Sequence, residues 1–152
     1  MTRSRVVLCW FYAAIAFAAL VGTWHQNLAY FRPDEGMLGF GLATGRFWPE
    51  TLATPASTSV TVDLGLLLVA LFTFMVIESR RLGIPFVWIY IVLGMLVAIS
   101  VTFPLFLIAR ERRLAARGEG AAGLGITLVD GLGLVALGAG AGCFTVWTVV
   151  LR

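Results

Sequence analysis

Two aspartates interrupt long apolar runs in this chain of 152 residues, and they are the side chains best placed for chemistry. Asp63 lies near the start of the second run, and Asp130 lies one or two turns into the last. An ionisable residue inside a membrane-spanning segment is a candidate functional residue, because a charge in hydrocarbon is costly. A buried carboxylic acid can also act as a general acid. The alternative is structural: each aspartate pairs with an arginine and locks the helices together.

Successive spanning helices alternate in direction, so residues near their ends fall into two groups on opposite membrane sides. One group is a candidate polar cluster of unknown catalytic role, made of Asn27, Asp63, Arg110, Glu111 and Asp130. The other group is Glu78, Arg80 and Arg81. Cations at the end of a helix complement its dipole and bind lipid headgroups, so we interpret this second group as a membrane-interface anchor.

Other kinds of site are not indicated. Cys9 and Cys143 lie in apolar runs, and His25 is the single histidine, so no metal-ligand set is recognisable and we expect no cofactor. The arginines stand in short clusters between apolar runs, which argues against a nucleic-acid surface and for membrane lipids as partners. Several aromatic residues near the ends of the runs are typical of an interfacial belt: Trp10, Trp24, Tyr30, Trp48, Trp88 and Trp147.

The elements that must position these residues are apolar helices. Hydrophobic residues make up 60% of the chain and charged residues only 12%, against about a quarter in a soluble domain. A spanning helix needs about 20 apolar residues. We therefore predict an all-α, polytopic membrane protein, residues 1–152 forming a single domain with four transmembrane helices at about 6–24, 60–77, 84–109 and 124–151.

The long connection between the first two helices should carry structure of its own. Pro33, Asp34 and Glu35 are typical of a helix start, and we predict a short interfacial or re-entrant helix that ends near Gly45. The return stretch with Pro49 and Pro55 is expected to be extended. Pro104 predicts a kink late in the third helix.

Four crossings place both termini on one side of a cell membrane. Five arginines then lie on the side of the termini and six on the other side, so the arginine count hardly indicates which side of this multi-pass protein faces the cytoplasm. The two arginines before the first helix favour cytoplasmic termini. Small residues let helices approach closely. We expect the first and fourth helices to pack through such faces, or to form a homo-oligomer or a larger membrane complex through them: Ala14, Ala18 and Gly22; Gly138 and Gly142.

The stretch 74–114 resembles a family of uncharacterised membrane proteins, domain of unknown function 2834. The resemblance rests on Glu78-x-Arg80-Arg81-Leu82-Gly83, on Trp88, on Pro104-Leu105-Phe106-Leu107, on Arg110-Glu111 and on the acid Asp63. It covers roughly residues 6–115. Where the family tends to have an asparagine and a serine before that acid, residues 55–60 differ. The resemblance implies a multi-helix membrane fold and no particular activity.

Three functions remain open. The first is a non-catalytic structural or accessory membrane component. The second is a small membrane enzyme that acts on a lipid or isoprenoid by cyclase-like acid catalysis. The third is a transporter or channel component that uses Asp63 and Asp130. The first helix has no charge between Val6 and Trp24, which is unlike small four-helix exporters and counts against the third.

Overall fold

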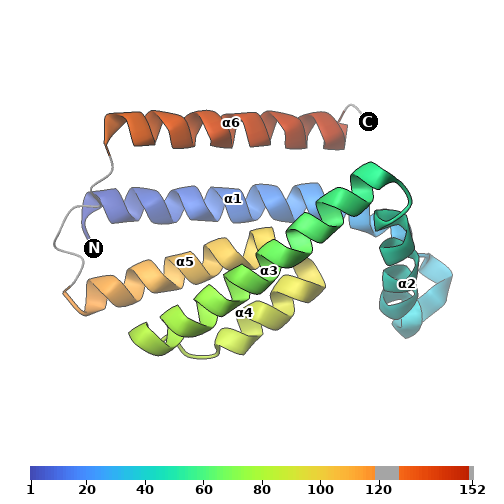
Figure 1. Ribbon diagram of the computed structural model, residues 1–152, viewed down its shortest axis with the longest axis horizontal. Coiled ribbons are helices and arrows are strands. Elements are labelled where there is room, and N and C mark those ends of the chain that lie inside the picture. Colours follow the sequence, from blue (N-terminus) through green and yellow to red (C-terminus); the bar gives the residue numbers. More distant parts are fainter. Residues whose placement is uncertain (119–126, 151–152) are drawn as a thin grey trace.

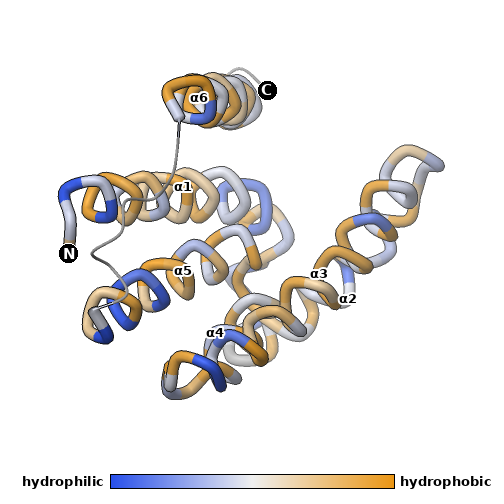
Figure 2. Tube along the Cα trace, turned by 60° about the vertical axis from the view of Figure 1, so that its left-hand side comes forward, coloured by the Kyte–Doolittle hydropathy of each residue, from blue (hydrophilic) through white to orange (hydrophobic). Residues whose placement is uncertain are grey.

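The computed structural model describes residues 1–118 and 127–150, except for the Met37 side chain, and every regular element in these residues is helical (Figure 1). Four helical stretches are long and apolar enough to cross a membrane: Arg3–Tyr30, Pro55–Leu82, Val87–Ala116 and Leu128–Val150. Hydrophobic residues occupy much of these helices, and hydrophilic ones gather near several of their ends (Figure 2). The predicted all-α polytopic membrane fold is confirmed.

The predicted short helix after the first span is also present. Helix α1 (Arg3–Asn27) is followed by η1 (Leu28–Tyr30), η2 (Pro33–Leu38) and α2 (Gly39–Thr51). We expected this helix to end near Gly45, but α2 continues through Pro49 to Thr51. Pro49 lies in the last turn of α2, where it removes the hydrogen bond to the Gly45 carbonyl four residues earlier without ending the helix.

Helix α3 (Pro55–Leu82) starts five residues earlier than predicted because the chain supplies a complete cap. The Thr54 hydroxyl accepts from the Ser57 amide at 3.1 Å, and the Ser57 hydroxyl accepts from the Thr54 amide at 3.1 Å. Pro55 occupies the first turn, where its missing N–H costs nothing. The chain from Pro55 onwards is therefore helical and not extended. At its other end, α3 stops at Leu82 because Gly83 has a φ of +66°, the left-handed conformation that glycine adopts without strain.

The third apolar stretch folds back on itself, and here the structure corrects a predicted single helix. It consists of α4 (Val87–Leu93), the π-helical η3 (Gly94–Ala98) and α5 (Ile99–Ala116). Ala98 is extended, with φ −176° and ψ 137°, and the chain reverses there. The rings of Tyr90 and Phe106 are 5.8 Å apart, whereas one straight helix would separate them by about 24 Å. The break is therefore at Ala98 and not at Pro104, which stays inside α5.

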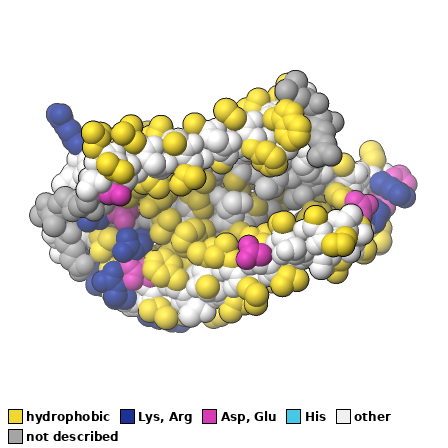
Figure 3. Space-filling model, turned by 45° about the horizontal axis from the view of Figure 1, so that its top comes forward, with side chains coloured by type: hydrophobic (Ala, Val, Ile, Leu, Met, Phe, Trp, Pro, Cys, Tyr) yellow, Lys and Arg dark blue, Asp and Glu magenta, His cyan; other side chains and the backbone are white. Residues whose placement is uncertain are grey.

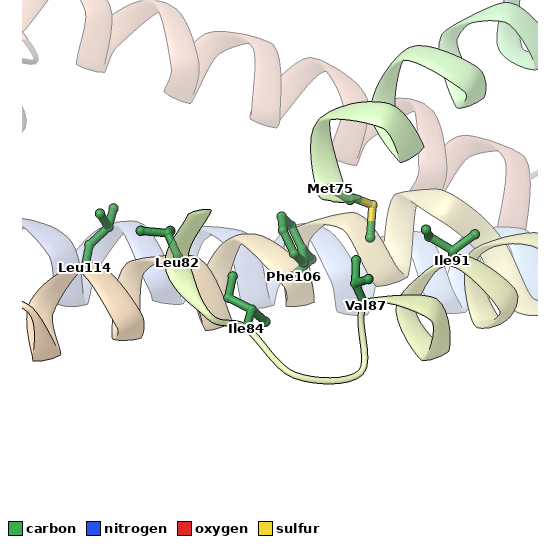
Figure 4. Packing of buried hydrophobic residues seen from close by; sticks show 7 residues of the cluster. All are labelled: Met75, Leu82, Ile84, Val87, Ile91, Phe106 and Leu114. Atoms are coloured by element: carbon green, nitrogen blue, oxygen red, sulfur yellow. The ribbon is translucent and has the colours of Figure 1, made fainter. Parts of the chain in front are cut away.

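This hairpin of α4, η3 and α5 packs against α3 around a small core (Figure 4). Phe106 of α5 and Met75 of α3 are both 0% exposed and lie at its centre. Gly94 makes the close approach of the two hairpin arms possible, because a Cβ there would lie 2.8 Å from Thr102 Oγ1. The core consists of Met75, Leu82, Ile84, Val87, Ile91, Phe106 and Leu114.

Helix α6 (Leu128–Val150) runs parallel to α1 (Figure 1). A Cβ on Gly138 would lie 3.3 Å from Phe11, a Cβ on Gly22 would lie 2.7 Å from Thr145, and Gln26 Nε2 donates to the Thr148 carbonyl at 3.3 Å. The expected packing of the first and last helices is therefore observed at Gly22 and Gly138.

The relative placement of the helix ends differs from our expectation. Because the hairpin returns to the end at which it started, α6 begins beside the start of α1. Val150 consequently lies at the opposite end from Arg3, and the two ends of the described chain do not share one side.

Candidate functional site

A chain of alternating charges joins three helices at the end of the molecule that holds Arg3. Arg5 Nη1 forms an ion pair with Glu111 Oε2, and Glu111 Oε1 accepts from Arg110 Nη1 at 2.8 Å. Arg110 Nε lies 2.7 Å from Glu78 Oε1, and Glu78 Oε2 lies 2.7 Å from Arg81 Nε. We call these five residues the charge chain. It links α1, α3 and α5 through side chains alone.

Both acids of the charge chain are shielded. The side chains of Glu78 and Glu111 are 8% and 4% exposed, and that of Arg5 is 9% exposed. A buried charge is tolerated when it is paired and fully hydrogen-bonded, and removing one partner is strongly destabilising. Figure 3 shows arginine and acidic side chains gathered at this end, with a largely apolar surface beyond it. The charge chain thus binds the last turns of α5 to the start of α1 and to the end of α3.

The predicted polar cluster is divided by this arrangement. Arg110 and Glu111 join Glu78 and Arg81, which we had placed on the opposite side, because the hairpin returns the end of α5 to the end of α3. Arg80 is exposed beside them, and Glu78, which we grouped with it as an interface anchor, is buried in ion pairs. The convergence that we expected of Arg110 and Glu111 with Asp63 is wrong.

The two aspartates lie at different ends of the fold. Asp130 accepts from the Thr127 amide at 2.9 Å and from the Thr127 hydroxyl at 2.7 Å, so it fixes the start of α6 near the charge-chain end. Asp63 is exposed on the first half of α3, towards the other end. They do not form a shared site.

A chamber of about 360 Å³ lies at the opposite end from the charge chain, where the hairpin turns. The last turns of α1, then α2, α3 and the hairpin tip 94–100 surround it. Asn27, one of the predicted site residues, is part of its wall. No described residue of the wall is charged, and six of them are aromatic: Trp24, Tyr30, Phe31, Phe40, Phe47 and Trp48.

Polar contacts hold α2 against the chamber. Arg46 of α2 binds Glu35 through two hydrogen bonds of 2.7 Å and donates from Nε to the Tyr30 carbonyl at 3.2 Å. The Tyr30 hydroxyl donates to Glu50 at 2.5 Å. The hydrogen bonds from Arg46 hold the pKa of Glu35 below its usual value. These contacts keep α2 beside η1 and Phe31, where Phe47 packs on Tyr30 and Phe40 packs on Phe31.

Sequence reasoning missed this chamber, since it assigned the aromatic residues near run ends to an interfacial belt. The signal that could have indicated it is their density, six aromatic residues between positions 24 and 48. The part of its wall formed by residues 94–100 could not be predicted from the sequence, because the reversal at Ala98 lies within a long apolar run.

The family described as protein of unknown function DUF2834 matches residues 11–112. The chain belongs to this family. The matched part of the chain contains the described chamber wall, most of the hairpin and four of the five charge-chain residues, and α6 lies outside it. No curated protein and no solved structure matches the chain.

Proposed function

We propose that this integral membrane protein is a non-catalytic accessory component of the membrane. One observation carries the proposal: among the described residues, no aspartate, glutamate, histidine or cysteine lines the chamber. Glu78 and Glu111 are held in ion pairs, and Asp130 accepts hydrogen bonds from Thr127. Acid catalysis of the cyclase kind needs a carboxylic acid beside its substrate, and the chamber has none.

Lipid analysis tests this proposal. Total lipid and isoprenoid extracts from cells that express the protein, from cells that lack it and from cells that express Asp63→Asn should have the same profile by mass spectrometry. A product that appears with the protein and disappears with Asp63→Asn would overturn the proposal and favour the membrane enzyme.

The break at Ala98 favours a second candidate, a transport component. Discontinuous helices in transporters expose backbone groups to a substrate in mid-membrane. Against this stands the separation of Asp63 and Asp130, the two acids named in that hypothesis, which lie towards opposite ends of the fold. Proton flux into liposomes that contain the purified protein tests it, and the accessory role predicts the same flux as in empty liposomes.

We further propose that the charge-chain end faces the cytoplasm of the cell that carries the protein. Cytoplasmic loops of membrane proteins are rich in arginine and lysine. Eight of the ten described arginines lie at this end, and two at the other. They are Arg3, Arg5, Arg80, Arg81, Arg110, Arg112, Arg113 and Arg117, with Arg32 and Arg46 opposite.

An accessory component needs a partner, and we propose that the partner, another membrane protein or a second copy, packs on α6. No described residue of α6 is buried, and a Cβ on Gly142 would meet nothing within 4 Å. Cys143 is exposed beside it. A thiol oxidant added to native membranes should join the Cys143 thiols of two copies in a disulfide when the partner is a second copy, in a Cys9→Ser background, and Cys143→Ser is the control.

A further inference from the structure

We propose that the first half of α3 is a docking surface for a membrane-spanning helix of another protein, and that an arginine or lysine of that helix binds the Asp63 carboxylate. The inference rests on the proposed accessory role, but it concerns a different helix from α6 and states the chemistry of the partner. Three observations carry it: Asp63 has no partner among the described residues, the helix face around it is exposed and apolar, and it lies at the depth of the hydrocarbon.

The Asp63 side chain has no polar partner in the part of the chain that the structure describes. Both acids of the charge chain are held by arginines, and Asp130 accepts from Thr127, but no described residue forms a hydrogen bond or an ion pair with Asp63. It is also absent from the described chamber wall. Ionisable side chains within a membrane pair with one another or face a water-filled cavity, because a lone charge in hydrocarbon is costly. The missing counter-charge must therefore come from outside the described chain.

The helix face around Asp63 is apolar and uncovered. On a helix surface, the neighbours of a residue are those three and four positions away. For Asp63 these are Ser59, Val60, Leu66 and Leu67, and all four are exposed. Val60 and Leu66 are 67% and 70% exposed. A carboxylate surrounded by aliphatic side chains is thus presented outwards by a surface that no described helix covers.

The other face of the same half of α3 fixes this orientation. Leu64 and Leu68 line the chamber, and the Thr61 hydroxyl donates to the Thr51 carbonyl at 3.1 Å. These residues face the bundle, so α3 cannot turn Asp63 inwards without giving up these contacts.

The depth of Asp63 excludes a position in the headgroup layer. Asp63 precedes Glu78 of the charge chain by 15 residues, which corresponds to about 22 Å along the helix axis. The hydrocarbon core of a bilayer is about 30 Å thick, and the inclination of α3 to α1 reduces the depth that this length reaches (Figure 1). With the charge chain at one headgroup layer, Asp63 lies within the hydrocarbon. Long arginine and lysine side chains reach the interface from such positions, whereas an aspartate side chain is too short.

The charge of Asp63 and its depth together select the partner. The arginines in the described spanning stretches all lie at the charge-chain end, so a second copy would offer none at the depth of Asp63. Arg32 and Arg46 lie outside these stretches, and His25 is in the last turn of α1. Lipid headgroups are confined to the surface layers. A spanning helix of another protein that carries an arginine or lysine meets both requirements, since opposite charges attract strongly in a medium of low dielectric constant.

The experiment is site-specific photo-crosslinking of the full chain in the membranes of the cells that naturally carry it. The photoreactive variant is Leu66→p-benzoylphenylalanine, one helical turn from Asp63. We expect a cross-linked membrane protein, identified by mass spectrometry, whose cross-linked spanning segment contains an arginine or lysine. Adding Asp63→Asn should lower the cross-linked fraction by about fivefold or more, the effect of losing one interhelical polar contact in lipid. Asp63→Glu should retain most of it, and Asp34→Asn, an exposed acid outside the spanning stretches, is the matched control and should change nothing.

Two further measurements separate an ion pair from an effect on folding. Replacing the partner's arginine or lysine by glutamine should lower the cross-linked fraction as Asp63→Asn does, and Asp63→Arg combined with aspartate at the partner's position should restore it. The Tm of purified Asp63→Asn in detergent should equal that of the wild type, because no contact between described residues is lost.

Several results would contradict the proposal. They are cross-linking to lipid alone, cross-linking to a second copy, a cross-linked segment without a cation, and a cross-linked fraction that Asp63→Asn leaves unchanged. A lowered Tm of Asp63→Asn would show that its partner is within the chain.

A photoreactive residue on α6 distinguishes failure of this inference from failure of the accessory role. Val135 is 64% exposed on α6, and Val135→p-benzoylphenylalanine reports on the other proposed surface. A partner captured at Val135 but not at Leu66 would reject the α3 surface and leave the accessory role in place. A lipid product that depends on the protein would reject the accessory role itself.

Discussion

Arg5, in the first turn of α1, forms an ion pair with Glu111 in the last turns of α5, 106 residues further along the chain. The same glutamate accepts from Arg110, which also binds Glu78 of α3. One carboxylate therefore joins the start of the fold to the end of the hairpin.

Removing the Glu111 charge should destabilise the protein strongly. Glu111→Gln removes the buried carboxylate that both Arg5 and Arg110 bind, and we expect a loss of about 3 kcal/mol in the free energy of unfolding. Thermal unfolding in a mild detergent measures it. Arg112→Gln, at the adjacent exposed residue, is the control and should have little effect. The reversal Arg5→Glu with Glu111→Arg should recover part of the loss, and an unchanged Glu111→Gln would show that the pair is dispensable.

Adding one methyl group at Gly94 should open the hairpin tip. Because a Cβ there would lie 2.8 Å from Thr102 Oγ1, Gly94→Ala forces a backbone shift, and we expect a destabilisation of about 1–3 kcal/mol. Adding Thr102→Ala should restore much of it. Gly65→Ala in α3 is the control, since nothing lies within 4 Å of its Cβ position. A stable Gly94→Ala would contradict the close contact.

The hairpin makes a direct prediction about which residues share a membrane side. In a background without Cys9 and Cys143, Ser4→Cys and Arg112→Cys should react with an impermeant maleimide from the same side of sealed vesicles. Leu52→Cys should react from the other side. A single through-going third helix predicts instead that Arg112→Cys reacts together with Leu52→Cys, and inverted vesicles provide the control for access.

The contact between α2 and the chamber should depend on pH through Glu35. Its folded-state pKa is lowered, so its stabilising contribution is complete above the ordinary pKa of about 4.3 and is lost as the pH falls through the lowered value. In a variant whose only tryptophan is Trp48, iodide quenching should be constant near neutral pH and should rise in that acidic range. Glu35→Gln should remove this transition, and a transition that persists would assign it to another acid.

The helices themselves were predictable because length and hydropathy alone determine which segments lipid can accommodate. A helical segment that starts at Pro33 was also predictable, but it is the 3-10 helix η2, which is interrupted at Gly36, and α2 begins only at Gly39. The reversal at Ala98 was not predictable, since an apolar run of 26 residues fits a single crossing and alanine is a good helix former. That one reversal moved Arg110 and Glu111 to the other end. It also separated Asp63 from Asp130, so an error in one element became an error in the site.

Helix α6 differs from the others in how little of the fold depends on it. None of its described residues is buried, it packs on α1, and every ion pair among the described residues joins elements that precede it. The family match also ends before it. The hydrophobic core and every ion pair of the described residues therefore lie within the first 116 residues, so removing α6 would leave each of these contacts in place and would uncover only the face of α1 on which it packs.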